Sequence, residues 1–101
     1  MKMLVIVFRE SLVEHVHALL NEYEVTGFSE LHNVGGKGAT GSTSQFFLAP
    51  TTNRMILAAV SEQSAYRLVD GFTRFRLAQE AAQGDNAFPL HVFILPCEQA
   101  V

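Results

Sequence analysis

The segment Lys2–Phe8 (KMLVIVF) is, after its lysine, an unbroken run of apolar and β-branched residues. Such a run is typical of a β-strand that is buried on both faces. Two later segments, Arg54–Val60 (RMILAAV) and Leu90–Leu95 (LHVFIL), are almost as apolar. These segments decide the fold, because they predict three strands of a sheet that lacks the alternation of apolar and polar residues expected when one face is open to water.

Two amphipathic helices are predicted between the strands. Ser11 and Glu14 fit the capping-box pattern S-x-x-E, so we expect the first helix to begin at Ser11. It is predicted to end near Val25–Gly27, where β-branched residues precede a glycine. The second helix is predicted to begin at Ser61 and to extend to Gln83, with its apolar residues on one side.

The segment Phe28–Val34 lies between two glycine signals and is too short for a capped helix, so it is predicted to be the remaining strand. The resulting order is strand, helix, strand, loop, strand, helix, strand. This is the ferredoxin-like split βαβ arrangement of the α+β class, a four-stranded antiparallel sheet with two helices on one face. Residues 1–101 then form one domain around one core, and another copy of the chain is the simplest cover for the second sheet face.

Composition excludes several classes of protein. Hydrophobic residues make up 49% of the chain and charged residues 17%, against about 25% charged in an average soluble domain. The net charge is -3 with seven Lys and Arg residues, so nucleic acid is not an expected partner. No apolar run approaches the ~20 residues that span a bilayer, and the single Cys97 suits a reducing compartment, so we expect a cytoplasmic protein.

The most distinctive segment follows the second predicted strand and consists of Gly35, Gly36, Lys37 and Gly38. Glycines at a strand end let backbone N–H groups approach an anion closely, and a lysine adds charge, although a plain flexible loop is the alternative. The segment opens a loop over about residues 36–52, a length that is usual for functional or mobile loops. Its apolar triplet Phe46–Leu48 either docks a partner or begins the next strand or a hairpin.

No enzyme is predicted, because the sequence shows no nucleophile with a base, no carboxylate pair and no metal cluster. His15 and His17 are two residues apart on a helix and point about 200° from each other, so they cannot share a metal ion. The other two histidines, His32 and His91, lie within apolar strands. They become metal ligands only if the fold or a second subunit brings them to a donor such as Glu30 or Cys97.

The chain resembles the P-II family of nitrogen regulatory signalling proteins. The resemblance lies in the strand at Met1–Val7, the glycine-basic segment with a long loop after it, and the closing strand Val92–Glu98 (VFILPCE), which is similar to the family's I-F-V-L-P-V-E. It implies a homotrimer with the sheets facing inward and adenine nucleotides in the clefts between subunits. It also implies that the long loop controls a transporter, an enzyme or a regulator.

The resemblance also implies site residues. Gly35, Gly36, Lys37 and Gly38 match the family's phosphate-contacting loop base, and Gly84 and Asp85 match the first half of its G-D-G-K turn. Asn86 and Ala87 replace the second half, Glu98–Val101 supplies no basic pair, and the loop has no tyrosine. Two or three missing cationic contacts at about 1.5–3 kcal/mol each speak against the usual binding of ATP.

With these departures the chain resembles divergent P-II-like branches, which are linked to bicarbonate transport, carboxysome-related genes or metal efflux. We therefore expect a regulator that senses a mono- or diphosphate nucleotide or a small anion. One alternative is a metal-binding protein, either a copper-tolerance protein of the CutA type or an accessory of a heavy-metal efflux system. Another is a small ferredoxin-like enzyme of the monooxygenase or isomerase kind, for which the sequence offers no acid-base partner.

Overall fold

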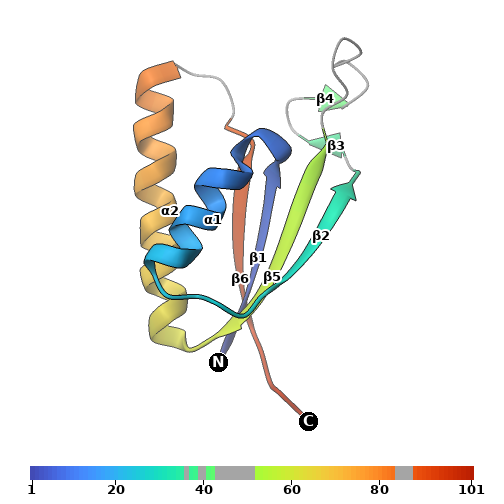
Figure 1. Ribbon diagram of the computed structural model, residues 1–101, viewed down its shortest axis with the longest axis vertical. Helices are drawn as coiled ribbons and strands as arrows, with labels where there is room; N and C mark the ends of the chain where they lie inside the picture. The colour runs from blue at the N-terminus through green and yellow to red at the C-terminus, as the bar shows by residue number, and fades with distance from the viewer. Residues whose placement is uncertain (36, 39–40, 43–51, 84–87) are drawn as a thin grey trace.

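The computed structural model describes residues 1–35, 37–38, 41–42, 52–83 and 88–101. The described elements follow the predicted order (Figure 1). They are β1 (Lys2–Arg9), the 3-10 turn η1 (Glu10–Leu12), α1 (Val13–Glu22), β2 (Ser29–Val34), β3 (Lys37–Gly38), β4 (Gly41–Ser42), β5 (Asn53–Val60), α2 (Glu62–Gln83) and β6 (Leu90–Pro96).

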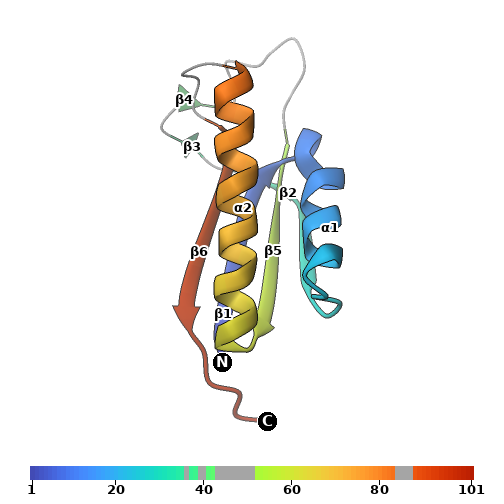
Figure 2. The same ribbon diagram turned by 90° about the vertical axis from the view of Figure 1, so that its left-hand side faces the viewer.

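Four strands form one antiparallel sheet in the order β2-β5-β1-β6. The central strand β1 pairs with β5 on one side and with β6 on the other, so that Val5 lies opposite both Leu57 and Phe93. Both helices pack on the same face of the sheet (Figures 1 and 2). The predicted ferredoxin-like fold is therefore confirmed.

The core lies between the helices and the sheet. Along β1 every second residue, Leu4, Ile6 and Phe8, is at most 1% exposed, as the two-residue period of a strand requires. From the helices, Val16 and Leu20 of α1 and Ala65, Leu68 and Phe72 of α2 complete this core, together with Ile56, Ala58 and Leu90 from the neighbouring strands.

The opposite face of the sheet is also apolar but carries no helix. The large apolar side chains on this open face are Met3, Val5, Val7, Leu31, Met55, Leu57, Phe93 and Leu95, and the face also carries Ser29, Ala59 and His91. Phe93 and Leu95 remain 54% and 47% exposed. The expectation that both faces of the sheet would be apolar is met, and none of the described residues covers the open face.

The start of α1 corrects the capping-box prediction. Ser11 lies inside η1 and α1 begins at Val13, with Leu12 at its N-cap and no side-chain cap hydrogen bond. Tertiary contacts determine this geometry: the backbone N–H of Glu10 donates to the carbonyl of Thr52 at 2.9 Å, and the Glu10 carboxylate binds Arg54. The chain is thus held to β5 before the helix can begin.

The end of α1 also differs from the prediction, because the helix stops at Glu22, before Val25–Gly27. Glu24 takes the left-handed conformation (φ 61°) that terminates many helices and that glycine adopts most easily. The N–H of Val25 donates to the Leu20 carbonyl at 2.8 Å, and Val25 itself is buried. Burial of Val25 accounts for this early end at a residue that is not glycine.

Helix α2 has the predicted bounds. Ser61 caps it, since its hydroxyl accepts a hydrogen bond from the Ser64 N–H at 3.1 Å. In the middle of α2, Gly71 lies against Tyr23, and a Cβ there would stand 2.5 Å from the tyrosine Cε2. The Tyr23 hydroxyl accepts a hydrogen bond from Arg74, and Arg67 lies over the ring, so Tyr23 fastens α1 to α2.

The two edge strands differ in regularity. On β2 the pairing with β5 shifts between Leu31 and Val34, and Asn33 has a left-handed backbone (φ 55°). This is a β-bulge, a feature common at sheet edges. Beyond β2 the short strands β3 and β4 pair as a hairpin, with Lys37 opposite Ser42, within the segment that was predicted to be one continuous loop.

Candidate functional site

Four strands meet two connections at one end of the sheet, the one from β2 to β5 and the one from α2 to β6. There β1 and β2 end and β5 and β6 begin, at the top of Figure 1. The backbone N–H of Arg9 donates to the carbonyl of Pro89 at 3.1 Å, and that of Glu10 donates to Thr52 at 2.9 Å. Adjacent residues at the end of β1 therefore hold the last residues of both connections, and we call this region the loop end.

The predicted ligand-binding residues belong to these two connections. Gly35 directly follows β2, is exposed, and has open space where a Cβ would stand. Lys37 and Gly38 form β3. Gly36, Gly84 and Asp85 lie outside the described residues, as does the triplet Phe46–Leu48, which comes before the first residue of β5. The assignment of these residues to ligand binding stays a prediction.

The two predicted segments lie next to opposite edges of the sheet. Gly35 follows β2, whereas Gly84 and Asp85 precede β6, and β5 and β1 lie between these edge strands. Three strand spacings of about 4.8 Å separate the edges by about 14 Å. A small ligand that draws on both segments therefore needs loops that fold over the sheet end, or a second subunit that brings its own edge alongside.

A charged network borders the loop end on the helix side of β2 and β5. Arg54 donates from Nε to Oε1 of Glu10 at 2.7 Å, and its Nη2 lies 2.7 Å from Glu10 Oε2. Its Nη1 also donates to Oε2 of Glu30. His17 Nε2 lies 2.7 Å from Oε1 of Glu30, and His32 Nε2 lies 4.0 Å from Oε2. One guanidinium thus joins η1, β5 and β2, and Glu30 extends the network to α1.

The network changes the protonation equilibria of its members. The hydrogen bond from Arg54 lowers the pKa of Glu10. Burial would raise the pKa of Glu30, but the hydrogen bonds from Arg54 and His17 outweigh it and leave that pKa lowered. The hydrogen bonds to Glu10 and Glu30 raise the pKa of Arg54. All three groups are therefore held in their charged forms.

The sequence did not predict this network. The available signal was weak: Glu10 and Arg54 are charged residues at the ends of two apolar runs, and only the pairing of those runs brings the two side chains together. His17 and His15 are exposed, as expected for helix histidines. In the part of the chain that the structure describes, no three His, Cys, Asp or Glu side chains form a group that could hold a metal ion.

Comparison with known proteins assigns the family. The chain matches the family described as Nitrogen regulatory protein P-II over residues 1–101. It belongs to the P-II family. No curated protein sequence matches this P-II chain.

Solved structures similar to this P-II chain include CPII, a nitrogen regulatory PII-like protein from Thiomonas intermedia. Its complex with ADP, AMP and bicarbonate has a TM-score of 0.68 and 27% sequence identity, and the match covers 93% of this chain and 88% of that one. The complex with ADP and bicarbonate gives a TM-score of 0.69 and 28% identity over 92% and 81%. A PII-like signalling protein from Thermus thermophilus, 16% identical with a TM-score of 0.55 over 92% and 80%, shares the fold.

No helix among the described residues of this P-II chain is long and apolar enough to cross a membrane. The cytoplasmic location stays a prediction. The metal-binding alternative also stays a prediction. The Glu30 carboxylate, 4.0 Å from His32 Nε2, is already bound by Arg54.

Proposed function

We propose that this P-II protein is a homotrimeric sensor that binds an adenine mono- or diphosphate nucleotide or a small anion at the loop end of the sheet. The ligand lies in a cleft between subunits and changes the conformation of residues 36–52. That segment in turn controls a partner protein such as a membrane transporter. In this proposal the chain has a regulatory role and catalyses no reaction.

The observation that carries the proposal is the attachment of both connections to the end of β1. Arg9 binds the residue before β6, and Glu10 binds the residue before β5. A ligand at this end can therefore change the connection that holds Lys37 and the connection that holds Gly84 and Asp85 at the same time. Coupling of this kind is what a ligand-dependent switch requires.

Two further observations support the ligand class and the assembly. CPII, at 27% identity, binds ADP, AMP and bicarbonate, which are the mono- and diphosphate nucleotides and the kind of small anion expected from the missing basic residues. The open apolar face offers a contact surface for other subunits, and its burial is favourable by about 25 cal/mol per Å². Assembly through this face also places the edge of one sheet near another subunit.

The proposal is tested by isothermal titration with ADP, AMP, ATP and bicarbonate, after light scattering has fixed the number of subunits. The chain has two lysines, Lys37 in β3 and Lys2 at the opposite end of the sheet. We expect Lys37→Ala to weaken ADP binding roughly 10- to 100-fold, the value of one charge-assisted phosphate contact, and the matched Lys2→Ala to leave it unchanged.

Equal affinities for the two lysine variants would remove Lys37 from the site. A protein that binds none of these ligands would contradict the sensor function itself. A dimer or a monomer at micromolar concentration would contradict the proposed assembly.

A further inference from the structure

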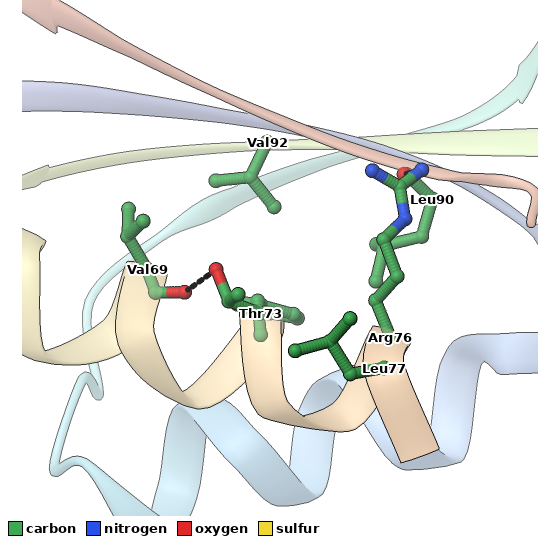
Figure 3. A pocket seen from close by; sticks show the side chains of 7 residues that line it. Val69, Thr73, Arg76, Leu77, Leu90 and Val92 are labelled. Atoms are coloured by element: carbon green, nitrogen blue, oxygen red, sulfur yellow. Dashed lines mark hydrogen bonds between the residues drawn. The ribbon is translucent and has the colours of Figure 1, made fainter. Parts of the chain in front are cut away.

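A histidine lies at the border of the open face. His91 is the second residue of β6, and its side chain is exposed. Its neighbours Leu90 and Val92 line a pocket against α2, on the covered side of the sheet (Figure 3). Because side chains alternate along a strand, His91 points to the opposite side, which is the open face. An imidazole is therefore present on a surface whose large side chains are apolar.

His91 is also close to the loop end. It pairs with Val7 of β1, two residues before Arg9, the last residue of that strand. Arg9 binds the carbonyl of Pro89 through its backbone N–H and follows the same alternation as Val7, so Arg9 and His91 are diagonal neighbours on the open face, roughly 7–8 Å apart. Among the described strand residues of this face, these two are the only ones with titratable side chains. Both are at its border with the loop end.

The surroundings of His91 fix the strand and leave the ring exposed. On the covered side, Arg76 of α2 donates from Nη2 to the carbonyl of Phe88 at 3.2 Å and to that of Leu90, so the start of β6 is fastened to the helix (Figure 3). On the open face, the ring of His91 stacks on that of Phe93, with centroids 6.4 Å apart and planes at 27°. Stacking uses the faces of the ring, so the two nitrogens at its edge can bind a polar partner.

Position and charge make His91 a candidate contact for the proposed ligand. That ligand is anionic and lies at the loop end in a cleft between subunits, and His91 is next to this end on the face through which subunits are proposed to meet. A protonated imidazole has two N–H donors, and a hydrogen bond from a charged donor to a phosphate oxygen is roughly twice as strong as one between neutral groups. Lys37 follows the opposite edge strand, β2, so His91 supplies a cation on the β6 side.

We infer that protonated His91 binds a phosphate group of the adenine nucleotide, so that the affinity of the site rises as the pH falls. The inference rests on the proposed nucleotide binding and adds its regulation by pH. Histidine suits this role because its charge ordinarily changes between pH 5 and pH 8. The sensor then responds to the nucleotide and to the proton concentration together.

The test is isothermal titration of the full chain and of His91→Gln with ADP at pH 6 and at pH 8. A phosphate group also changes its charge in this range, so the quantity compared is the ratio of the two dissociation constants at each pH, from which the ligand's own ionisation cancels. We expect His91→Gln to weaken ADP binding roughly tenfold at pH 6, the loss of one charge-assisted hydrogen bond, and roughly threefold or less at pH 8, where the imidazole is neutral.

Two further variants separate charge from structure. His91→Lys is charged at both pH values, so its advantage over His91→Gln at pH 8 should be at least as large as that of the unmodified chain at pH 6. His15→Gln is the matched control, because His15 is exposed on α1 and contacts only the Phe75 ring among the described residues. It should bind ADP as the unmodified chain does at each pH.

Adenosine, which has no phosphate, reports on the rest of the site. His91→Gln should bind it as tightly as the unmodified chain does at both pH values. Three results would each overturn the inference: an ADP ratio that is the same at pH 6 and pH 8, an equal loss of affinity for ADP and adenosine, or no gain from His91→Lys at pH 8. In each case the proposed function stands if ADP still binds. If the unmodified chain binds no ADP at either pH, the proposed nucleotide binding and this inference are both contradicted.

Discussion

Along β1, the side chains that point toward the helices and those that point away are equally apolar but have different surroundings. Leu4, Ile6 and Phe8 are enclosed by α1, α2 and the neighbouring strands, whereas Met3, Val5 and Val7 lie on a face that the described residues leave uncovered. Apolar character alone therefore does not separate a core from an interface. The difference teaches that one strand serves two hydrophobic surfaces, one completed within the chain and one that, in the proposed trimer, other subunits complete.

The largest expected effect compares two phenylalanines on the two faces. Phe8→Ala leaves a cavity in the core and should lower the free energy of unfolding by about 3–5 kcal/mol at every protein concentration. Phe93→Ala, on the open face, should cost less, and its effect should depend on protein concentration. Urea denaturation at two concentrations a hundredfold apart measures both. A concentration-independent loss at Phe93 equal to that at Phe8 would break the comparison.

A charge on the open face should prevent assembly without unfolding the chain. Leu57 lies opposite Val5 and Ser29 near the centre of this face, so Leu57→Glu would bury a carboxylate in the subunit contact. We expect light scattering to show a monomer of 11.1 kDa with an unchanged circular dichroism spectrum. Tyr66→Glu, at an exposed position on α2, is the control and should assemble normally. Assembly of Leu57→Glu would show that subunits contact each other elsewhere.

The charged network of Arg54, Glu10 and Glu30 should make the free energy of unfolding depend on pH. The pKa values of Glu10 and Glu30 are lowered, so their contribution to stability is complete above the ordinary glutamate pKa of about 4.3 and is lost as the pH falls through the lowered values. Arg54→Met should therefore be most destabilising near neutral pH, with a deficit that shrinks in acid. Urea denaturation from neutral to acidic pH measures it.

Arg67→Met is the control for the acid series, because Arg67 lies over the Tyr23 ring and is in none of the ion pairs found among the described residues. Its deficit should vary little with pH. A constant deficit for Arg54→Met would mean that the network does not bear on stability through its charges.

The smallest expected effect concerns the way in which the helices are fixed over the covered face. Gly71→Ala gains up to about 1 kcal/mol of helix propensity but displaces the Tyr23 ring, so we expect little net change or a small loss. In the Tyr23→Ala background the same substitution should be stabilising by up to about 1 kcal/mol. Thermal denaturation of the four proteins measures the coupling. An equal effect of Gly71→Ala in both backgrounds would contradict the contact.

The fold was largely predictable because its elements carry local patterns. The strands at Lys2–Arg9, Asn53–Val60 and Leu90–Pro96 and the helix that begins after Ser61 lie within one residue of the predicted bounds. The prediction was wrong at both ends of α1, where contacts distant in the sequence override local signals. Ser11 fits a capping box but lies in η1. The helix ends before Val25 because the side chain of Val25 is buried in the core.

The candidate sites were less predictable, for a related reason. The network of Arg54 joins residues 24 and 44 positions away, a relation that no local spacing encodes. Arg76 had a detectable signal, since it follows Phe72 by four residues and so falls on the apolar side of α2. A cation at such a position either reaches past the core or has a partner there. Here Arg76 donates to the carbonyl of Leu90, the first residue of β6, and to that of Phe88 just before the strand.

The two edges of the sheet bear on how far an assembly of these chains can grow. An unmodified edge strand invites another strand, and repeated pairing of that kind yields an open-ended fibre. Here β2 is distorted by the bulge at Asn33. At the start of β6 the Leu90 carbonyl already accepts a hydrogen bond from the guanidinium of Arg76. Both borders therefore disfavour lateral addition, while the open face remains available for contact. This division favours a closed assembly with a fixed number of chains over indefinite polymerisation.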